Sequence, residues 1–212
     1  MGRIYYILVS VLVLVLAGGG ISSAYVQPWK DEVKKSTYIV NDSCTGYLTR
    51  RNYVITASHC VGVVGDFIQV SSMLTREKFT GRVVYDDPRR DMAAIMVPAL
   101  GGYWRRPCPS TRMFDVLWSY NYSLGLSGWE SYLEYRGKYY STTEDQDIVV
   151  MEGKAYPGAS GSIVWDDYYG CPVGMITKGV FSGAVPTLIG PAADEVERKL
   201  LDRLVGLPVL GM

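Results

Sequence analysis

From residue 37 onward the chain consists of short apolar runs interrupted by glycine, proline and polar turn residues, and this pattern limits it to short extended segments. The sequence holds 23 glycines, 10 prolines and 17 tyrosines, with valine frequent within the runs. β-branched and aromatic residues between turn residues are typical of strands joined by tight turns. We therefore predict an all-β fold.

The runs fall into two sets. The first set fits one small antiparallel barrel and lies at 37–40, 46–49, 53–56, 67–71, 78–85 and 92–97. The second set, of about six runs, lies at 114–119, 131–135, 139–142, 148–152, 161–165 and 173–180. The predicted organisation is a linker at 25–36, an N-terminal barrel at 37–98, an interdomain connection at 99–113 and a C-terminal barrel at 114–191.

The last segment, 192–212, is expected to hold a helix and a tail. Val196, Leu200 and Leu204 are four residues apart among charged residues, which is the spacing of one face of a helix. We expect this face to pack on the second barrel.

The first 24 residues have the features of a targeting segment. Arg3 is followed by an uncharged apolar stretch, and Ser22, Ser23 and Ala24 are small residues of the kind found at signal-peptidase sites. The segment is predicted to be either a cleaved signal peptide or an uncleaved anchor that associates with a membrane through residues 4–20. Either way, the rest of the chain is expected outside the cytoplasm, as a secreted, periplasmic or extracellular protein.

Overall charge points to no particular partner. Lysine plus arginine and aspartate plus glutamate each number 21, so no excess of positive charge indicates a nucleic-acid ligand. With 48% hydrophobic residues the chain has enough apolar material for one domain or two small joined ones.

The four cysteines are expected to form disulfides, since an exported chain meets an oxidising compartment. Cys44 and Cys60 enclose a short loop, and closing a loop of about 15 residues stabilises a fold by ~3 kcal/mol in the chain-entropy model. Cys108 and Cys171 are left to pair with each other if their Cα atoms come within reach. With a single histidine and no Cys-x-x-Cys motif, we expect neither a metal site nor a cofactor.

The residues that flank this histidine, His59, indicate a role for it. The runs Cys44-Thr45-Gly46-Tyr47-Leu48 and Tyr53-Val54-Ile55-Thr56-Ala57-Ser58-His59-Cys60 resemble the histidine segment of trypsin-like peptidases. In that family a hairpin delivers the imidazole and a disulfide ties its loop. Ser58 stands where the family usually has alanine.

Three aspartates compete as partners of the imidazole. Asp86 and Asp87 precede Pro88 and are interpreted as turn residues. Asp91 instead opens an apolar strand, where a carboxylate is costly unless hydrogen-bonded, and the ring N–H of His59 is a suitable donor. The spacing is similar to the Asp-Pro-x-x-Asp-x-Ala-x-x-x-Val stretch of HtrA-like proteases.

The segment Gly158-Ala159-Ser160-Gly161 is similar to the Gly-x-Ser-Gly motif of the same family. Taken alone, this tetrapeptide is more often a glycine-rich turn. An α/β-hydrolase would need glycine two positions after the serine and the chain order Ser, Asp, His. Here Ser162 stands at that position, and the order is His, Asp, Ser.

The resemblance implies a chymotrypsin-like fold of two six-stranded antiparallel β-barrels with a C-terminal helix. It also implies a serine endopeptidase that acts on polypeptides through an acyl-enzyme intermediate. Ser160 is the expected nucleophile, His59 the general base and Asp91 its orienting partner, with the N–H groups of Gly158 and Ser160 forming the oxyanion hole. Ala159 replaces the aspartate of digestive zymogens, so we expect no activation through a freed N-terminus.

Substrate preference is less well indicated. Lys154 stands six residues before Ser160, where it would either form a pocket base suited to acidic side chains or be a solvated loop lysine. Met175, Ile176 and Thr177 are expected on the opposite pocket wall. The sequence specifies neither the substrate nor the oligomeric state.

Two alternative functions remain open. One is a membrane-tethered viral protease that processes a polyprotein, and the other is a catalytically silent trypsin-fold protein that binds peptides. The intact set of His59, Asp91 and Ser160 disfavours the silent version.

Overall fold

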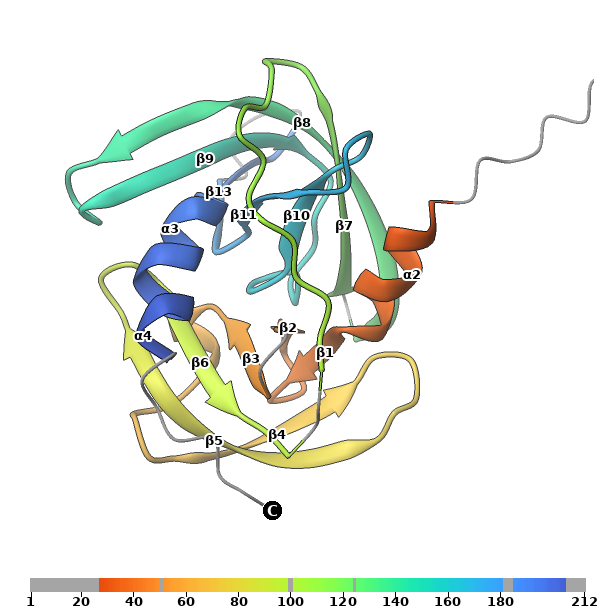
Figure 1. Ribbon diagram of the computed structural model, residues 1–212, viewed down its shortest axis with the longest axis vertical. Helices are drawn as coiled ribbons and strands as arrows, with labels where there is room; N and C mark the ends of the chain where they lie inside the picture. The colour runs from red at the N-terminus through yellow and green to blue at the C-terminus, as the bar shows by residue number, and fades with distance from the viewer. Residues whose placement is uncertain (1–26, 50–51, 99–100, 124, 181–184, 205–212) are drawn as a thin grey trace, which may run out of the picture.

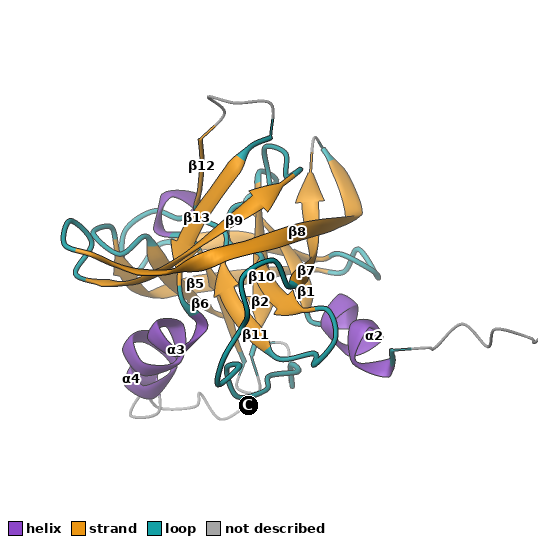
Figure 2. Ribbon diagram, turned by 90° about the horizontal axis from the view of Figure 1, so that it is seen from above, coloured by secondary structure: helices purple, strands orange, loops and turns teal. Residues whose placement is uncertain are grey.

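A computed structural model describes residues 27–49, 52–98, 101–123, 125–180 and 185–204, with the side chains of residues 126 and 127 not described. Two β-sheets make up most of it, one below the other in Figure 1, and helices pack at opposite sides in Figure 2. The predicted targeting segment, 1–24, lies outside the described residues. Among the helices that are described, none is long and apolar enough to cross a membrane.

The first sheet is a closed antiparallel barrel in the order β1-β2-β3-β6-β5-β4. Its strands are β1 (Thr37–Val40), β2 (Cys44–Leu48), β3 (Tyr53–Thr56), β4 (Phe67–Ser72), β5 (Lys78–Asp87) and β6 (Met92–Met96). Alternation along β3 explains its complete burial, because Val54 points into the barrel core while Tyr53 and Ile55 contact the layer between the sheets. The predicted six-stranded first barrel is confirmed.

The second sheet is a curled half-barrel of seven strands in the order β11-β10-β7-β8-β9-β13-β12. Its strands are β7 (Val116–Ser123), β8 (Leu126–Ser141), β9 (Gln146–Gly153), β10 (Ile163–Asp166), β11 (Pro172–Met175), β12 (Lys178–Val180) and β13 (Thr187–Pro191). The strand count differs from the expected six. The runs at 131–135 and 139–142 form the single strand β8, whose register shifts between Tyr135 and Gly137. The run at 173–180 divides into β11 and β12, and β13 is additional.

Helix α2 (Pro28–Lys35) occupies most of the segment interpreted as a linker. Proline at its first turn lacks only an N–H that no helix would use. Trp29 is buried against Trp118 of β7, with ring centroids 5.4 Å apart in an edge-to-face arrangement. Burial of that indole turns a polar segment into a docked helix.

The C-terminal helix runs through α3 (Ala193–Val196), the π-helical segment η2 (Glu197–Leu201) and α4 (Asp202–Leu204). Val196, Leu200 and Leu204 are all buried in the core between the sheets, so the apolar face read from the sequence is confirmed.

Both expected disulfides are present. Cys44 and Cys60 join β2 to the short 3-10 helix η1 (Ser58–Cys60), with Cα atoms 6.0 Å apart. Cys108 and Cys171 join the connection between the sheets to the turn before β11, with Cα atoms 5.2 Å apart.

Candidate active site

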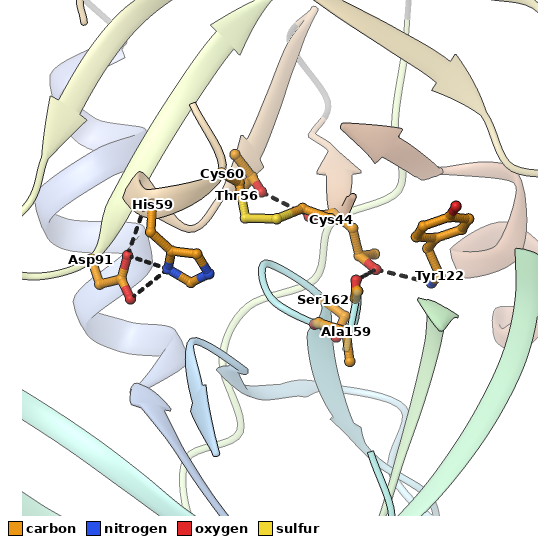
Figure 3. The surroundings of a disulfide bond; sticks show 10 residues. Cys44, Thr56, His59, Cys60, Asp91, Tyr122, Ala159 and Ser162 are labelled. Carbon is orange, nitrogen blue, oxygen red and sulfur yellow. Dashed lines mark hydrogen bonds and ion pairs between the residues drawn. A yellow bond between two sulfur atoms is a disulfide. The ribbon is translucent and has the colours of Figure 1, made fainter. Parts of the chain in front are cut away.

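His59 and Asp91 meet at one end of the first barrel (Figure 3). Strand β3 leads into η1, which carries His59, and Asp91 stands immediately before β6, the strand paired with β3. Nδ1 of His59 lies 3.0 Å from both Oδ1 and Oδ2 of Asp91. The backbone N–H of His59 also donates to Asp91 Oδ1 at 3.1 Å. The carboxylate therefore fixes both the ring and its peptide group.

The pair is electrostatically coupled. The hydrogen bond to Asp91 raises the pKa of His59 above its ordinary value of 6.5, and burial opposes this. Burial alone would raise the pKa of Asp91, yet the hydrogen bonds from His59 outweigh it and hold that pKa below 3.8. The Asp91 side chain is 9% exposed and that of His59 48% exposed, so the carboxylate is screened from water while the ring remains accessible.

The second ring nitrogen is directed away from Asp91. In Figure 3 it points toward the side on which the loop of Ala159 and Ser162 lies. With Nδ1–H donated to the carboxylate, the neutral ring keeps Nε2 as an acceptor. This is the tautomer that a general base requires.

The loop of Ser160 comes from the second sheet and is built from two successive turns. Ala159 N–H donates to Tyr156 O at 3.0 Å, and Ser162 N–H donates to Ala159 O at 3.1 Å. Gly158 and Gly161 have φ values of +105° and +85°, in the region that favours glycine. A Cβ on Gly161 would lie 2.1 Å from the main-chain oxygen of Thr45, so this glycine permits close contact with the first barrel.

Thr45 of β2 connects this loop to the histidine segment. Its N–H donates to Ser160 O at 2.9 Å, and its Oγ1 donates to Gly158 O at 2.8 Å. The same Oγ1 accepts the N–H of Tyr122 at 2.9 Å. Because Thr45 follows Cys44, whose disulfide partner adjoins His59, the serine loop and the histidine loop are fixed to the same strand end. Sequence reasoning missed this role, since a threonine in a strand is unremarkable by propensity.

Two main-chain donors of the serine loop have no acceptor in the described part of the chain. Within the described residues, the N–H groups of Gly158 and Ser160 donate no hydrogen bond, whereas those of Ala159 and Gly161 are both used. An oxyanion hole requires main-chain donors that are not already paired. No hydrogen bond joins Ser160 to His59 among the described residues.

A second contact braces the histidine loop. Ser58 Oγ donates to Asp86 Oδ1 at 2.5 Å, and Asp87 accepts both the backbone N–H and the guanidinium of Arg90. Asp86 and Asp87 are the last residues of strand β5. Asp87 also accepts the hydrogen bond that closes the turn before Asp91. The interpretation of both aspartates as turn residues therefore fits Asp87 and does not fit Asp86. One feature of the sequence indicates this contact, namely a serine at position 58, where the family usually has alanine.

The predicted specificity residues occupy different environments. Lys154 is exposed and makes no ion pair or hydrogen bond within the described residues. Ile176, the residue after β11, exchanges main-chain hydrogen bonds with Gly161 and Ser162, so this segment does lie beside the serine loop. The side chains of Met175 and Ile176 are buried in hydrophobic cores, however, and Thr177 is 4% exposed.

Beyond them, the exposed strand β12 ends the sheet. Its first residue, Lys178, forms an ion pair with Glu144 from the turn between β8 and β9.

Cys44, His59 and Cys60 are the one group in the described part of the chain whose ligand atoms lie close enough for a metal ion, within 4.8 Å. The two sulfur atoms are bonded to each other, so they are not thiolate ligands.

Fold and site together define a two-sheet protein of the chymotrypsin-like class. The chain belongs to the family of trypsin-like peptidase domains, whose match covers residues 44–175. No curated protein matches it.

Among solved structures it is similar to the Rv3671c protease of M. tuberculosis. Its active form has a TM-score of 0.71 at 20% identity, covering 87% of each chain. The inactive form of Rv3671c protease has a TM-score of 0.70 at 19% identity, covering 85% of this chain and 93% of that one. At such identity the likeness establishes the shared fold.

Proposed function

We propose that this peptidase is a serine endopeptidase in which His59, Asp91 and Ser160 form the catalytic triad. Nε2 of neutral His59 takes the proton of Ser160 Oγ as that oxygen attacks the scissile carbonyl. The protonated ring then returns the proton to the leaving amine, and an acyl-serine remains. Water, deprotonated by the same ring, hydrolyses the ester and frees the enzyme.

The observation that carries the proposal is the His59–Asp91 pair, in which Nδ1 of the ring lies within hydrogen-bond distance of both carboxylate oxygens. Ser160 is held near this pair by Thr45, whose N–H donates to Ser160 O. Asp91 keeps the proton on Nδ1 and stabilises the charged ring that forms during attack. The N–H groups of Gly158 and Ser160 have no acceptor among the described residues, which supports their proposed role as the oxyanion hole.

We further propose that the protein acts outside the cytoplasm, either secreted or held at a membrane by residues 4–20. Two disulfides support an oxidising compartment.

Labelling with a fluorophosphonate tests the mechanism. Wild-type protein should gain the mass of one phosphonyl group on Ser160, and Ser160→Ala should gain none. Asp91→Asn should label and hydrolyse peptides about 10⁴-fold more slowly, because the ring is then held in the wrong tautomer. Persistent labelling of Ser160→Ala would place the nucleophile elsewhere. A folded wild-type protein that is never labelled would favour the catalytically silent binding protein.

A further inference from the structure

A cavity of about 570 Å³ lies on the second sheet, and none of the residues lining it belongs to the site around His59. One wall is the connection between the sheets, with Pro109, Ser110 and Arg112, and the other is the turn between β10 and β11. The Cys108–Cys171 disulfide joins these two walls covalently. The cavity is therefore held in shape without a ligand.

Asp166 lines this cavity and has an unusual balance of contacts. The residue is 1% exposed, and its Oδ1 accepts the N–H groups of Tyr168 at 3.0 Å and Tyr169 at 2.8 Å. Its Oδ2 is buried and has no hydrogen-bond partner within the described residues. A buried carboxylate is costly unless paired, so the second oxygen lacks a donor that a cation would supply.

The remaining lining adds negative charge and aromatic surface. Asp115 and Asp167 also line the cavity, and only Asp167 is paired with a lysine, Lys30, at 2.5 Å. Tyr168 and Tyr169 are 83% and 61% exposed, and their rings meet edge to face with centroids 4.9 Å apart. Tyrosine faces beside carboxylates are a favourable environment for a guanidinium or ammonium group.

One basic residue, the exposed Arg112, is found among the described residues that line the cavity. It makes no ion pair within that part of the chain, and its backbone N–H donates to Asp115 Oδ2 at 2.7 Å. Lys30 is engaged by Asp167, and no lysine or arginine among the described residues forms an ion pair with Asp166.

From these observations we propose that the cavity binds a basic side chain, arginine or lysine, of a polypeptide. The guanidinium or ammonium group pairs with Asp166 Oδ2 and lies against the tyrosine rings. Binding does not require the catalytic triad, so this proposal stands or falls separately from the proposed peptidase mechanism.

The test uses the full chain carrying Ser160→Ala, so that no probe is hydrolysed. N-acetyl-arginine methylamide is titrated while amide signals are followed by NMR, and N-acetyl-citrulline methylamide serves as the neutral probe of the same shape. The arginine probe should shift the amides of Tyr168 and Tyr169 in a saturable way, and the citrulline probe should not. Equal shifts from both probes, or none from arginine up to its solubility limit, would overturn the proposal.

Variants then identify the partner atoms. Asp166→Asn keeps an acceptor for the two tyrosine N–H groups but removes the charge, and should weaken arginine binding by about ten- to a hundredfold. Asp42→Asn, in an exposed turn of the first barrel, removes the same charge far along the chain and should leave binding unchanged. Unaltered affinity in Asp166→Asn would refute the assignment.

Two exposed positions keep the test decisive if Asp166→Asn fails to fold. Tyr168→Ala should weaken binding by about threefold, as expected for one cation–π contact. Arg112→Gln should strengthen it by a similar factor of about three, since a competing cation near the carboxylates is removed. If neither variant changed the affinity for the arginine probe, the probe would bind outside this cavity and the proposed site would be refuted.

Discussion

Thr45→Val removes the bridge between the two loops while conserving shape. The side chain is fully buried, and its hydroxyl satisfies both the N–H of Tyr122 and the C=O of Gly158. Leaving a buried group unpaired costs about 1–3 kcal/mol, so losing both contacts should lower the free energy of unfolding by about 2–6 kcal/mol. The main-chain bond from residue 45 to Ser160 O remains, because valine keeps its N–H.

Activity should fall in a characteristic way. Gly158 carries one of the two proposed oxyanion donors, and losing one such donor costs about 10²–10³ in kcat. Because valine shifts this donor without deleting it, we expect kcat to fall by about 10–100-fold, with KM changed little. Thr45→Ser is the matched control, since it keeps the hydroxyl and loses one methyl group, about 1 kcal/mol of stability.

The assays are urea unfolding followed by tryptophan fluorescence, and kcat and KM on an unstructured peptide. If valine and serine variants have the same kcat, the hydroxyl supports folding alone and the link to the oxyanion hole is refuted. If neither variant loses stability, the bridge contributes nothing.

Three further predictions follow from the same site. The Asp91 hydrogen bond raises the pKa of His59, and only the neutral ring accepts a proton, so kcat/KM should fall as pH drops through a value above the ordinary 6.5. Asp91→Asn should move this limb to lower pH, and activity that is flat through the pKa of the ring measured by NMR would contradict the general-base role. Ser58→Ala loses the hydrogen bond to a carboxylate of β5, so urea unfolding should show a loss of about 1–2 kcal/mol while kcat/KM stays within about threefold. Gly161→Ala should abolish activity, because its Cβ would meet a main-chain oxygen. Gly65→Ala is its control for peptide turnover and unfolding, with a φ of +106° but no atom within 4 Å of the added Cβ; equal loss in both would mean that backbone strain is responsible and not the close contact.

Local patterns were sufficient for much of the fold. Short apolar runs bounded by turn residues located all six strands of the first barrel, and the four-residue spacing from Val196 to Leu204 located the C-terminal helix. The predicted strand boundaries were wrong where hydrogen bonding to a neighbouring strand continues through a residue that locally favours a turn. Gly137 looks like a break between two strands, yet it stands at a bulge that lets β8 continue along β9.

Helix α2 illustrates a limit of a different kind. Its sequence is polar, and only Trp29 and Val33 are buried. The stabilising surface is made by Trp118 and Trp165, whose rings approach Trp29 to 5.4 and 6.0 Å. Because Trp118 and Trp165 are far from Trp29 in the sequence, these contacts produce no local periodicity. The sequence therefore predicts a linker at this segment.

The candidate site divides in the same way. His59 and Asp91, read from motifs, do meet in space, because paired strands β3 and β6 deliver them to one barrel end. The bridging role of Thr45 and the pairing of Ser58 with Asp86 depend on which loops face each other, and one sequence does not contain that information.

The serine loop bears on the prediction that this chain needs no activating N-terminus. In digestive zymogens an aspartate at position 159 would bind a freed ammonium group and shape the oxyanion site, but here Ala159 is 2% exposed within an apolar cluster of the second sheet. A carboxylate there would be buried without a partner at a cost of several kcal/mol. The loop is instead held from the outside by Thr45 and from within by Ser162, whose N–H and Oγ both donate to Ala159 O. The Ser162 contacts form within the loop and the Thr45 contacts form when the two sheets dock, so we expect the geometry proposed for catalysis to arise with folding and to need no later cleavage.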